Sequence, residues 1–205
     1  MINIKKTTEP AFFTDIKNSP NVHTYDDLPA GCSNNLRGHM LQNEQSISDK
    51  KYCVYCEKQL PSHDACYCHL DHVRPQNLSP EKSLDYSNMV VSCNSNGTCG
   101  EHKEGKYPDN VINPVEVDPS DYFTFDLMTG ELKAKDSDKK IFCEATIKWL
   151  NIDNYSLQKF RKNMITVLNT YLKNNPRSEV KSIIESTIFD QPSLIQSFLQ
   201  QNSLL

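Results

Sequence analysis

The sequence predicts an α+β protein in which a small metal-stabilised centre of short strands lies between an N-terminal helical lead-in and a helical C-terminal region. Three observations lead to this prediction. Residues 49–115 are rich in Cys, His, Gly, Asn, Ser and Pro and lack the apolar residues of an ordinary core, so a metal ion is expected to replace part of it. Alternating apolar and polar residues around Thr129-Gly130 indicate a hairpin. Beyond residue 140, apolar residues recur at helical spacing.

Length and composition exclude several classes of protein. The chain has 205 residues, of which 37% are hydrophobic and 23% are charged, so it is long enough for one sizeable domain. No apolar run approaches the ~18 residues of a membrane span, and "MINIKKTTEP" lacks the apolar segment of a secretory signal. We therefore expect a cytoplasmic protein with no membrane partner. In that reducing compartment, eight cysteines favour metal ligation over disulfides.

Residues 1–48 are predicted to form a loop followed by the helical lead-in. The first 30 or so residues are polar and interrupted by prolines, which is typical of loops. From Asn34 to Ile47, apolar residues share one helical face, so a short helix is expected to lead into the cysteine-rich centre. The residues of this face are Leu36, Met40 and Ile47, with Leu41 beside it.

Residues 116–205 are predicted to form a hairpin followed by four helices. The hairpin is "YFTFDLMTGELKA". The fourth helix is expected to have Pro192 in its first turn, where a missing backbone N–H costs nothing. The apolar stripes of the four helices are Ile141, Phe142, Ala145 and Trp149; Leu157, Phe160, Met164, Val167, Leu168 and Tyr171; Val180, Ile183, Ile184 and Ile188; and Leu194, Ile195, Phe198 and Leu199.

Two cysteine pairs predict a structural zinc site. "CVYC" places two residues between Cys53 and Cys56, which lets both thiolates reach one tetrahedral ion. "CNSNGTC" places Cys93 and Cys99 on either side of a turn made of Asn, Ser and Gly. Four thiolates would complete a closed zinc site. Such a site can stabilise the fold alone, with no catalytic residues near it.

The other cysteines have simpler interpretations. Cys66 and Cys68 could replace one member of the quartet, bind a second ion with a nearby histidine, or be small apolar residues in a hairpin, and the one-residue gap favours the last. Cys32 and Cys143 are expected to be free, buried thiols. Outside the site discussed next, four histidines are expected to be exposed or locally hydrogen-bonded: His23, His39, His63 and His69.

Four residues in the cysteine-rich centre have the properties needed to cut a phosphodiester bond. Asp71-His72 lies in a β-prone stretch that ends at Pro75, and Asn88 and His102 follow. The reaction needs a base that deprotonates water and a divalent cation that stabilises the departing oxygen. A neutral histidine can be the base at cellular pH, and a carboxylate with one further neutral ligand can hold Mg²⁺ or Mn²⁺. A lone Asp-His pair is most often a surface accident, but here it lies inside a loop that zinc would close.

This order of residues resembles the HNH, or ββα-metal, endonucleases. Those enzymes have Asp-His, then Asn, then His or Asn, and their zinc-bearing members place this series between two cysteine pairs. The resemblance implies a zinc-stabilised ββα-metal fold in which the ion pins a two-stranded hairpin to the following helix. It also implies that His72 is the general base, that Asp71 is a ligand of the catalytic Mg²⁺ or Mn²⁺, and that Asn88 orients the base and closes the loop.

The second ligand of the catalytic metal is less directly matched. The resemblance implies His102, on the short helix after Cys99. Many members carry Asn or His immediately after the final cysteine, whereas this sequence has Gly100 there. Asn94 is therefore an alternative candidate.

The resemblance extends to a subfamily of bacterial HNH proteins found with retrons and in the Septu anti-phage system. "NNLRGHMLQNEQSISDKKYCVYCE" looks like the segment that leads into their nuclease module, and "HLDHVRP" and "DYSNMVVSCN" follow in the expected order. "ATIKWLNIDNYSLQKFR" resembles their helical element, so the likeness covers roughly residues 30–165. It implies a defence nuclease, with DNA as its substrate, that works with an ABC-type ATPase partner.

The charge of the chain is compatible with such a partner. A net charge of −4 gives no general attraction for nucleic acid, so positive surface would have to be local or supplied by another protein. The apolar stripes after residue 140 could dock that protein, although an intramolecular core is their commoner use. Two alternatives remain. One is a non-catalytic zinc-binding interaction module. The other is an RNA-targeting nuclease with the same site, because no motif that would distinguish DNA from RNA is evident.

Overall fold

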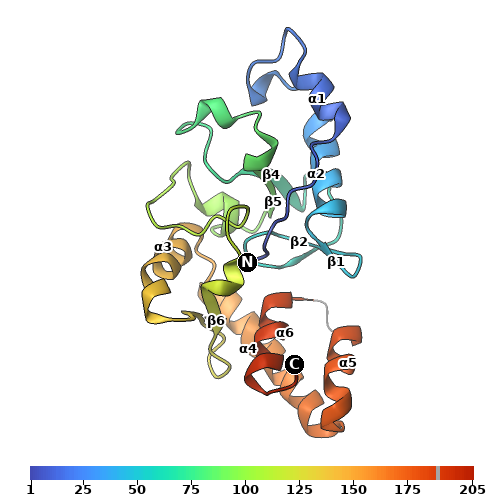
Figure 1. Ribbon diagram of the computed structural model, residues 1–205, viewed down its shortest axis with the longest axis vertical. Helices are drawn as coiled ribbons and strands as arrows, with labels where there is room; N and C mark the ends of the chain where they lie inside the picture. Colours follow the sequence, from blue (N-terminus) through green and yellow to red (C-terminus); the bar gives the residue numbers. More distant parts are fainter. Residues whose placement is uncertain (188–189) are drawn as a thin grey trace.

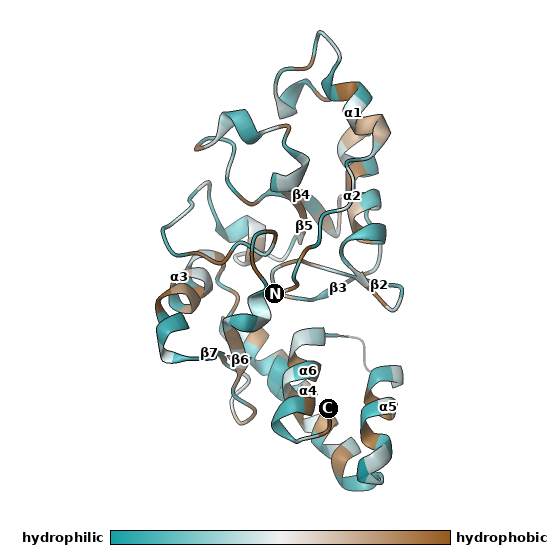
Figure 2. Cartoon of the chain, in the orientation of Figure 1, coloured by the Kyte–Doolittle hydropathy of each residue, from teal (hydrophilic) through white to brown (hydrophobic). Residues whose placement is uncertain are grey.

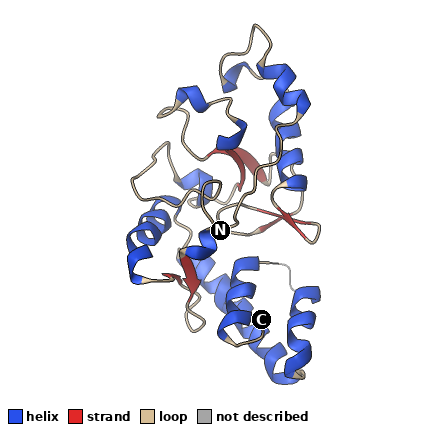
Figure 3. Ribbon diagram, viewed as in Figure 1, coloured by secondary structure: helices blue, strands red, loops and turns tan. Residues whose placement is uncertain are grey.

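The computed structural model describes residues 1–187 and 190–205 and has α-helices in the first and last parts of the chain, with short strands between them (Figures 1 and 3). The expected mixture of helices and strands is confirmed. The α-helices are α1 (Ala11–Lys17), α2 (Cys32–Asn43), α3 (Lys140–Leu150), α4 (Tyr155–Asn174), α5 (Arg177–Thr187) and α6 (Pro192–Gln201). The strands are β1 (Ser46–Ile47), β2 (Lys50–Tyr52), β3 (Gln59–Leu60), β4 (Cys68–His72), β5 (Met89–Cys93), β6 (Phe123–Phe125) and β7 (Leu132–Ala134). Within the described residues, no helix combines the length and apolarity needed to cross a membrane.

The strands form three small antiparallel sheets, β1-β2-β3, β4-β5 and β6-β7. The β4-β5 pair lies in the middle of the molecule, with α1 and α2 toward one end and α4 to α6 toward the other (Figure 1). Its register pairs Cys68 with Cys93 and His72 with Met89, and α2 packs against both strands. Every residue of β5 is buried, so the β4-β5 hairpin is held rigidly and positions the side chains of β4.

The predicted lead-in helix exists, but it ends earlier than expected. Its apolar residues Leu36, Met40 and Leu41 are fully buried, whereas Ile47 lies in β1 and is 42% exposed. The prediction that Ile47 extends the helical face was wrong because the side chain of Gln45 redirects the chain. Its amide donates to the carbonyls of Tyr52 and Val91 and accepts the N–H of Val91.

Helix α1 was not predicted. Pro10 precedes its first residue, and Phe13 is fully buried against Tyr86, with 6.4 Å between the ring centroids. Phe12 and Ile16 also pack against the core. Residues 12, 13 and 16 have helical spacing after a proline, and this signal was outweighed by the surrounding polar and proline-rich sequence.

The predicted hairpin and the helices after it are confirmed, with two qualifications. Strands β6 and β7 pair, and Pro192 lies in the first turn of α6. Ile141 was placed wrongly on the buried face of α3, because it is 57% exposed while Cys143 and Trp149 point inward. Ile188 lies outside the described residues. Cys32 and Cys143 are buried, as expected.

The three C-terminal helices build a small core of their own. Each carries apolar and polar residues in alternation along its ribbon (Figure 2). The apolar stripes of α4 to α6 are therefore used, at least in part, inside this chain. The residues of this core are Leu168, Val180, Ile184, Ile195, Phe198 and Leu199.

The start of α6 is attached to the first cysteine pair. The backbone N–H of Ser193 donates to Glu57 at 2.7 Å, and the side-chain amide of Gln191 donates to the carbonyl of Cys56. The C-terminal helices therefore contact the cysteine-rich centre directly.

We expect Gly130→Ala to lower the free energy of unfolding by about 2 to 4 kcal/mol. Gly130 has φ +79°, and a Cβ there would lie 2.6 Å from the carbonyl oxygen of Gln158, in the backbone of α4. Gly31→Ala is the matched control, since Gly31 has φ +86° but nothing within 4 Å, and about 1 kcal/mol is expected. Urea unfolding measures the free energy of unfolding of both variants. Equal losses of stability would show that the contact of the new Cβ with α4 does not destabilise the fold.

Candidate metal and catalytic site

The four predicted zinc ligands come together. The Sγ atoms of Cys53, Cys56, Cys93 and Cys99 all lie within 4.8 Å of one another, and all four residues are buried. A tetrahedral zinc with Zn–S bonds of about 2.3 Å separates its sulfurs by about 3.8 Å. The Sγ atoms of Cys56 and Cys93 are 3.7 Å apart. The four thiols could therefore hold a metal ion such as zinc.

Local backbone geometry brings these sulfurs into position. Glu57, just after Cys56, has φ +60°, and its N–H donates to the carbonyl of Cys53 at 3.0 Å, which closes a tight turn. Cys99 has φ +58° and begins the 3-10 helix η4 (Cys99–His102). The N–H of Cys93 also donates to the sulfur of Cys53 at 3.3 Å. N–H···S bonds of this kind stabilise a thiolate.

The electrostatics of the cluster favour a cation. Hydrogen bonds from Cys53, Cys56 and Cys99 lower the pKa of the Cys93 thiol, so one negative charge is readily held. Hydrogen bonds with Cys53 and then Cys93 raise the pKa of Cys56, and contacts with the other three thiols, that with Cys53 first, raise the pKa of Cys99. Four thiolates in so small a volume need a divalent ion to balance their charge.

The remaining cysteines lie outside this cluster. Cys66 is exposed, and Cys68 is buried in β4, where its sulfur lies 3.7 Å from the carbonyl of Ser62. Burial raises the pKa of the Cys68 thiol to about 11, which keeps it protonated. Cys68 thus behaves as a small apolar residue of the hairpin, the interpretation that its spacing favoured.

His72 ends β4 and is 6% exposed. Its Nε2 lies 2.9 Å from the carbonyl oxygen of Ser83. A carbonyl only accepts, so Nε2 carries the proton and Nδ1 keeps its lone pair. Nδ1 lies 3.3 Å from the side-chain amide of Gln76. Burial lowers the pKa of His72 below its usual value of 6.5, against the raising effects of Ser83 and Asp71, so the ring is neutral at pH 7.

Asn88 closes the loop that carries Ser83. Its Oδ1 accepts the N–H of Arg74 at 2.8 Å, and its Nδ2 donates to the carbonyls of Arg74 and Lys82. The N–H of Val73 donates to the Asn88 carbonyl at 2.8 Å. Asn88 therefore holds His72 indirectly, by fixing the loop whose Ser83 carbonyl orients the imidazole.

Asp71 is bonded to a buried lysine. Its Oδ2 accepts from the Tyr55 hydroxyl at 2.5 Å and from the Lys103 ammonium at 2.7 Å. The same ammonium donates to the carbonyl of His72 at 2.5 Å, and Lys103 is 3% exposed. Among the described residues, the side-chain hydrogen bonds of Asp71 all use Oδ2. Its Oδ1 is the oxygen left for another partner.

The two candidates for the second catalytic-metal ligand have hydrogen-bond partners of their own. Nδ1 of His102 lies 3.0 Å from the carbonyl oxygen of Trp149, at the end of α3. Asn94 bonds His69 and the carbonyl of Ala65. The structure therefore brings Asp71, His72 and Asn88 together. The Nδ1–H of His102 donates to the Trp149 carbonyl, which leaves the lone pair on Nε2, and the assignment of the second ligand to His102, with Asn94 as the alternative, stays a prediction.

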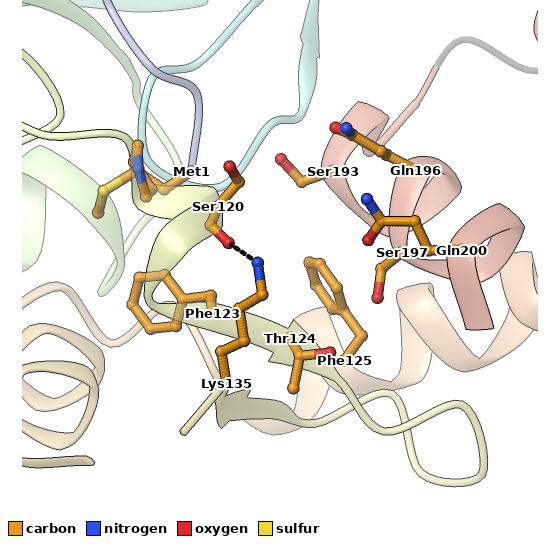
Figure 4. Close-up of a pocket in the computed structure, with 11 residues that line it drawn as sticks. Met1, Ser120, Phe123, Thr124, Phe125, Lys135, Ser193, Gln196, Ser197 and Gln200 are labelled. Carbon is orange, nitrogen blue, oxygen red and sulfur yellow. Dashed lines mark hydrogen bonds between the residues drawn. The ribbon is translucent and has the colours of Figure 1, made fainter. Parts of the chain in front are cut away.

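A cavity of about 280 Å³ opens beside these side chains. It is lined by Asp71, His72, Gln76, Gly100 and Lys103, among others. A cavity between β6 and α6, shown in Figure 4, has a volume of about 70 Å³ and none of the predicted site residues. The cavity beside His72 combines a base, a carboxylate and space for a substrate.

Sequence reasoning missed Tyr55, Ser83 and Lys103. Tyr55 lies inside the cysteine knuckle and Ser83 contributes only its backbone, so neither gave a signal. Lys103 follows His102 in a charged stretch typical of a solvated surface. Its burial depends on Asp71, and on Trp149, whose ring lies 5.3 Å from the ammonium.

We expect Lys103→Met to lower the free energy of unfolding by about 3 to 5 kcal/mol, because it leaves the Asp71 carboxylate buried without its cation. Lys106→Met is the control. Lys106 pairs with Glu104, but both side chains are about 70% exposed, so a change of at most ~1 kcal/mol is expected. Thermal unfolding measures both variants. An unaffected Lys103→Met protein would show that Asp71 needs no counter-charge.

The sequence matches no protein-family model, and no curated protein matches it either, so the function must be inferred from these residues and their geometry.

Proposed function

We propose that this protein is an HNH endonuclease that hydrolyses phosphodiester bonds of DNA, and that it acts in anti-phage defence with an ABC-type ATPase. The observation that carries the proposal is the environment of His72. Its imidazole is neutral, has one nitrogen bonded to the Ser83 carbonyl, and faces a cavity that also contains Asp71. A positioned neutral histidine is the commonest general base in enzymes.

The proposed reaction uses the lone pair on Nδ1. His72 takes a proton through Nδ1 from a water molecule that replaces the Gln76 amide there, and the resulting hydroxide attacks phosphorus as the bond to the 3′ oxygen breaks. The departing oxygen takes a proton from solvent. The bond from Nε2–H to Ser83 supports this role, because it fixes the ring plane and stabilises the imidazolium that forms.

Asp71 and Lys103 organise the site around that base. The Lys103 ammonium bonds both the Asp71 carboxylate and the carbonyl of His72, so it fixes the turn at the end of β4. A divalent cation bound to the free Oδ1 of Asp71 would supply the positive charge that the departing oxygen needs.

The choice of DNA and of an ATPase partner rests on the sequence resemblance and on charge. The net charge of −4 leaves little general attraction for a polyanion. A partner that supplies positive surface would bring the substrate to the cavity beside His72.

A cleavage assay tests the proposal. Zinc-loaded protein is incubated with supercoiled plasmid, single-stranded DNA and RNA in the presence of Mg²⁺ or Mn²⁺. Each reaction is run with this protein alone and with a candidate ABC-type ATPase partner. We expect metal-dependent cleavage of the DNA. Cleavage of RNA alone would overturn the choice of substrate. No cleavage under any condition, partner included, would favour the non-catalytic interaction module.

A further inference from the structure

We infer that a second cavity, between the turn at residues 95–98 and the start of α4, takes an unpaired base of a DNA strand, while exposed lysines beside it bind the flanking phosphates. The inference deepens the proposed function by naming a single strand as the part of the substrate that is bound. Its meaning for cleavage rests on that function, but binding of the strand does not. Three observations support it: two exposed aromatic rings, three lysines without an acidic partner, and a rigid polar wall.

The cavity has the size of a small-molecule site. Its volume is about 620 Å³, within the range of about 300 to 1,000 Å³ that is typical of ligand pockets. Lys58 and residues 95–98 line one side, and the beginning of α4 lines the other. Thr98 lines this cavity and Gly100 lines the cavity beside His72. Two residues span at most about 7 Å, so both cavities adjoin one short segment of the chain.

Two aromatic side chains of α4 line the cavity and are exposed to solvent. Tyr155 is 76% exposed and Phe160 is 40% exposed. Phe160 was expected on the buried stripe of α4, but the buried face of this helix runs through Arg161, Met164 and Leu168, which leaves the Phe160 ring at the surface. Exposed aromatic rings beside a cavity are what an unpaired base stacks on, whatever its sequence.

Three lysines near these rings have no acidic partner. Lys58 lines the cavity and is exposed. Lys159 and Lys162 are exposed on α4, one and two turns after Tyr155, so they share its face of the helix. Among the described residues, none of the three forms an ion pair, and α4 contains no acidic residue. This surface is therefore locally positive, as binding of phosphates requires.

The acidic residues next to the cavity lining in the sequence are already bonded or buried. Glu57 is 1% exposed, and Asp153 bonds Arg161 at 2.7 Å. Asp190 accepts a backbone N–H at 3.4 Å. Of the described residues that line the cavity, none is acidic. A phosphate bound beside the cavity would therefore meet lysines and no unpaired carboxylate of the lining.

A rigid turn supplies polar groups for the edge of the base. Nδ2 of Asn151 donates to the carbonyl of Gly97 at 2.7 Å, and Oγ1 of Thr98 donates to the carbonyl of Asn151 at 3.0 Å. These bonds tie the turn to the segment between α3 and α4. Asn96 lies at the exposed tip of the same turn and lines the cavity. Its amide both donates and accepts, so it can hydrogen-bond the edge of a stacked base.

Fluorescence anisotropy of a short fluorescein-labelled oligothymidine tests the inference. Zinc-loaded protein is titrated to about 10⁻⁴ M, the weak end of non-specific nucleic-acid affinity, in low salt and without Mg²⁺ or Mn²⁺. We expect saturable binding. Tyr155→Ala and Phe160→Ala should each weaken it about 5- to 150-fold, which corresponds to the roughly 1–3 kcal/mol of one stacked base, whereas Tyr155→Trp should bind as well as wild type. Tyr67→Ala is the matched control, because Tyr67 is 46% exposed but outside the lining, and its affinity should be unchanged.

The salt dependence of the same binding tests the lysines. Lys58→Met, Lys159→Met and Lys162→Met should each reduce the slope of log K against log salt concentration by about 0.7, the value for one phosphate of a single strand. Lys181→Met is the control, since Lys181 is an exposed lysine of α5, and its slope should equal that of wild type. Unchanged slopes in all three variants would show that these lysines bind no phosphate and would overturn their part of the inference.

Two unlabelled competitors identify the source of the base. A DNA duplex of the same length should compete about ten-fold more weakly than the oligothymidine, because its bases are already paired and stacked. Thymidine monophosphate should also compete weakly, since it offers a single phosphate to the lysines. Equal competition by the duplex would overturn binding of an unpaired base. Equal competition by the monophosphate would assign the cavity to a free nucleotide and overturn binding of a strand.

The inference and the proposed function can fail separately. No binding by wild type, or unchanged affinity when both Tyr155 and Phe160 are alanine, would overturn the inference and leave the nuclease proposal untouched. Strand binding that depends on both rings, without cleavage in any plasmid assay, would reject the proposed function and keep the cavity as a base site. Circular dichroism and zinc content verify folding. If Phe160→Ala does not fold, Tyr155→Ala, at the more exposed position, decides the result.

Discussion

His72→Ala is expected to reduce DNA cleavage by about 10²- to 10⁴-fold, the usual contribution of a general base. The loss follows because His72 lines the cavity and Nδ1 carries the lone pair of its neutral ring. Zinc content should not change, since the four thiols are contributed by other residues. The measurement is the rate of plasmid cleavage under the conditions in which wild type is active.

Two further variants separate catalysis from folding. His72 is buried and its ring lies edge-on to Tyr25, with 4.9 Å between the centroids, so alanine removes packing as well as a base. His72→Gln keeps most of the volume and an N–H donor for the Ser83 carbonyl, and it should be equally inactive but more stable. His23→Ala, at an exposed position, should be fully active. An active His72→Gln protein would remove His72 from the reaction.

Cys53→Ser is expected to unfold the cysteine-rich centre. Structural zinc sites contribute apparent binding free energies of about 10 to 16 kcal/mol, and a hydroxyl is a far weaker zinc ligand than a thiolate. Here the loss is compounded because the Cys53 sulfur also accepts the N–H of Cys93. We expect loss of bound zinc, measured by elemental analysis, together with loss of cooperative unfolding.

Cys66→Ser is the control for this prediction. Cys66 is exposed and lies outside the group of four thiols, so its replacement should alter neither zinc content nor stability. A chelator strong enough to remove zinc should reproduce the effect of Cys53→Ser in wild type. A folded, zinc-replete Cys53→Ser protein would contradict the structural role of the ion.

Much of the fold follows from local patterns in the sequence. The apolar stripes of α4 and α6 and the turn at Thr129-Gly130 are local signals, and each led to the correct element. The end of α2 was misplaced because Gln45 bonds Val91, a partner 46 residues away. A contact at that separation leaves no trace in a local pattern.

In the candidate site, too, the features with a local sequence pattern were predicted and those that depend on distant residues were missed. The cysteine spacing predicted the four thiols because two close pairs on tight turns are typical of a tetrahedral metal site. Lys103 was missed because its burial needs Asp71, 32 residues earlier in the chain. His69 was expected to be locally hydrogen-bonded, and it is bonded to Asn94.

The bond between Lys103 and Asp71 also bears on how the protein is made. A ribosome adds Asp71 and His72 to the chain well before Lys103, and Cys99 is likewise added only after them. A nascent polypeptide therefore cannot assemble the geometry around His72 until the segment through residue 103 has emerged. The DNA cleavage proposed above would thus be absent until about half of the 205 residues have emerged.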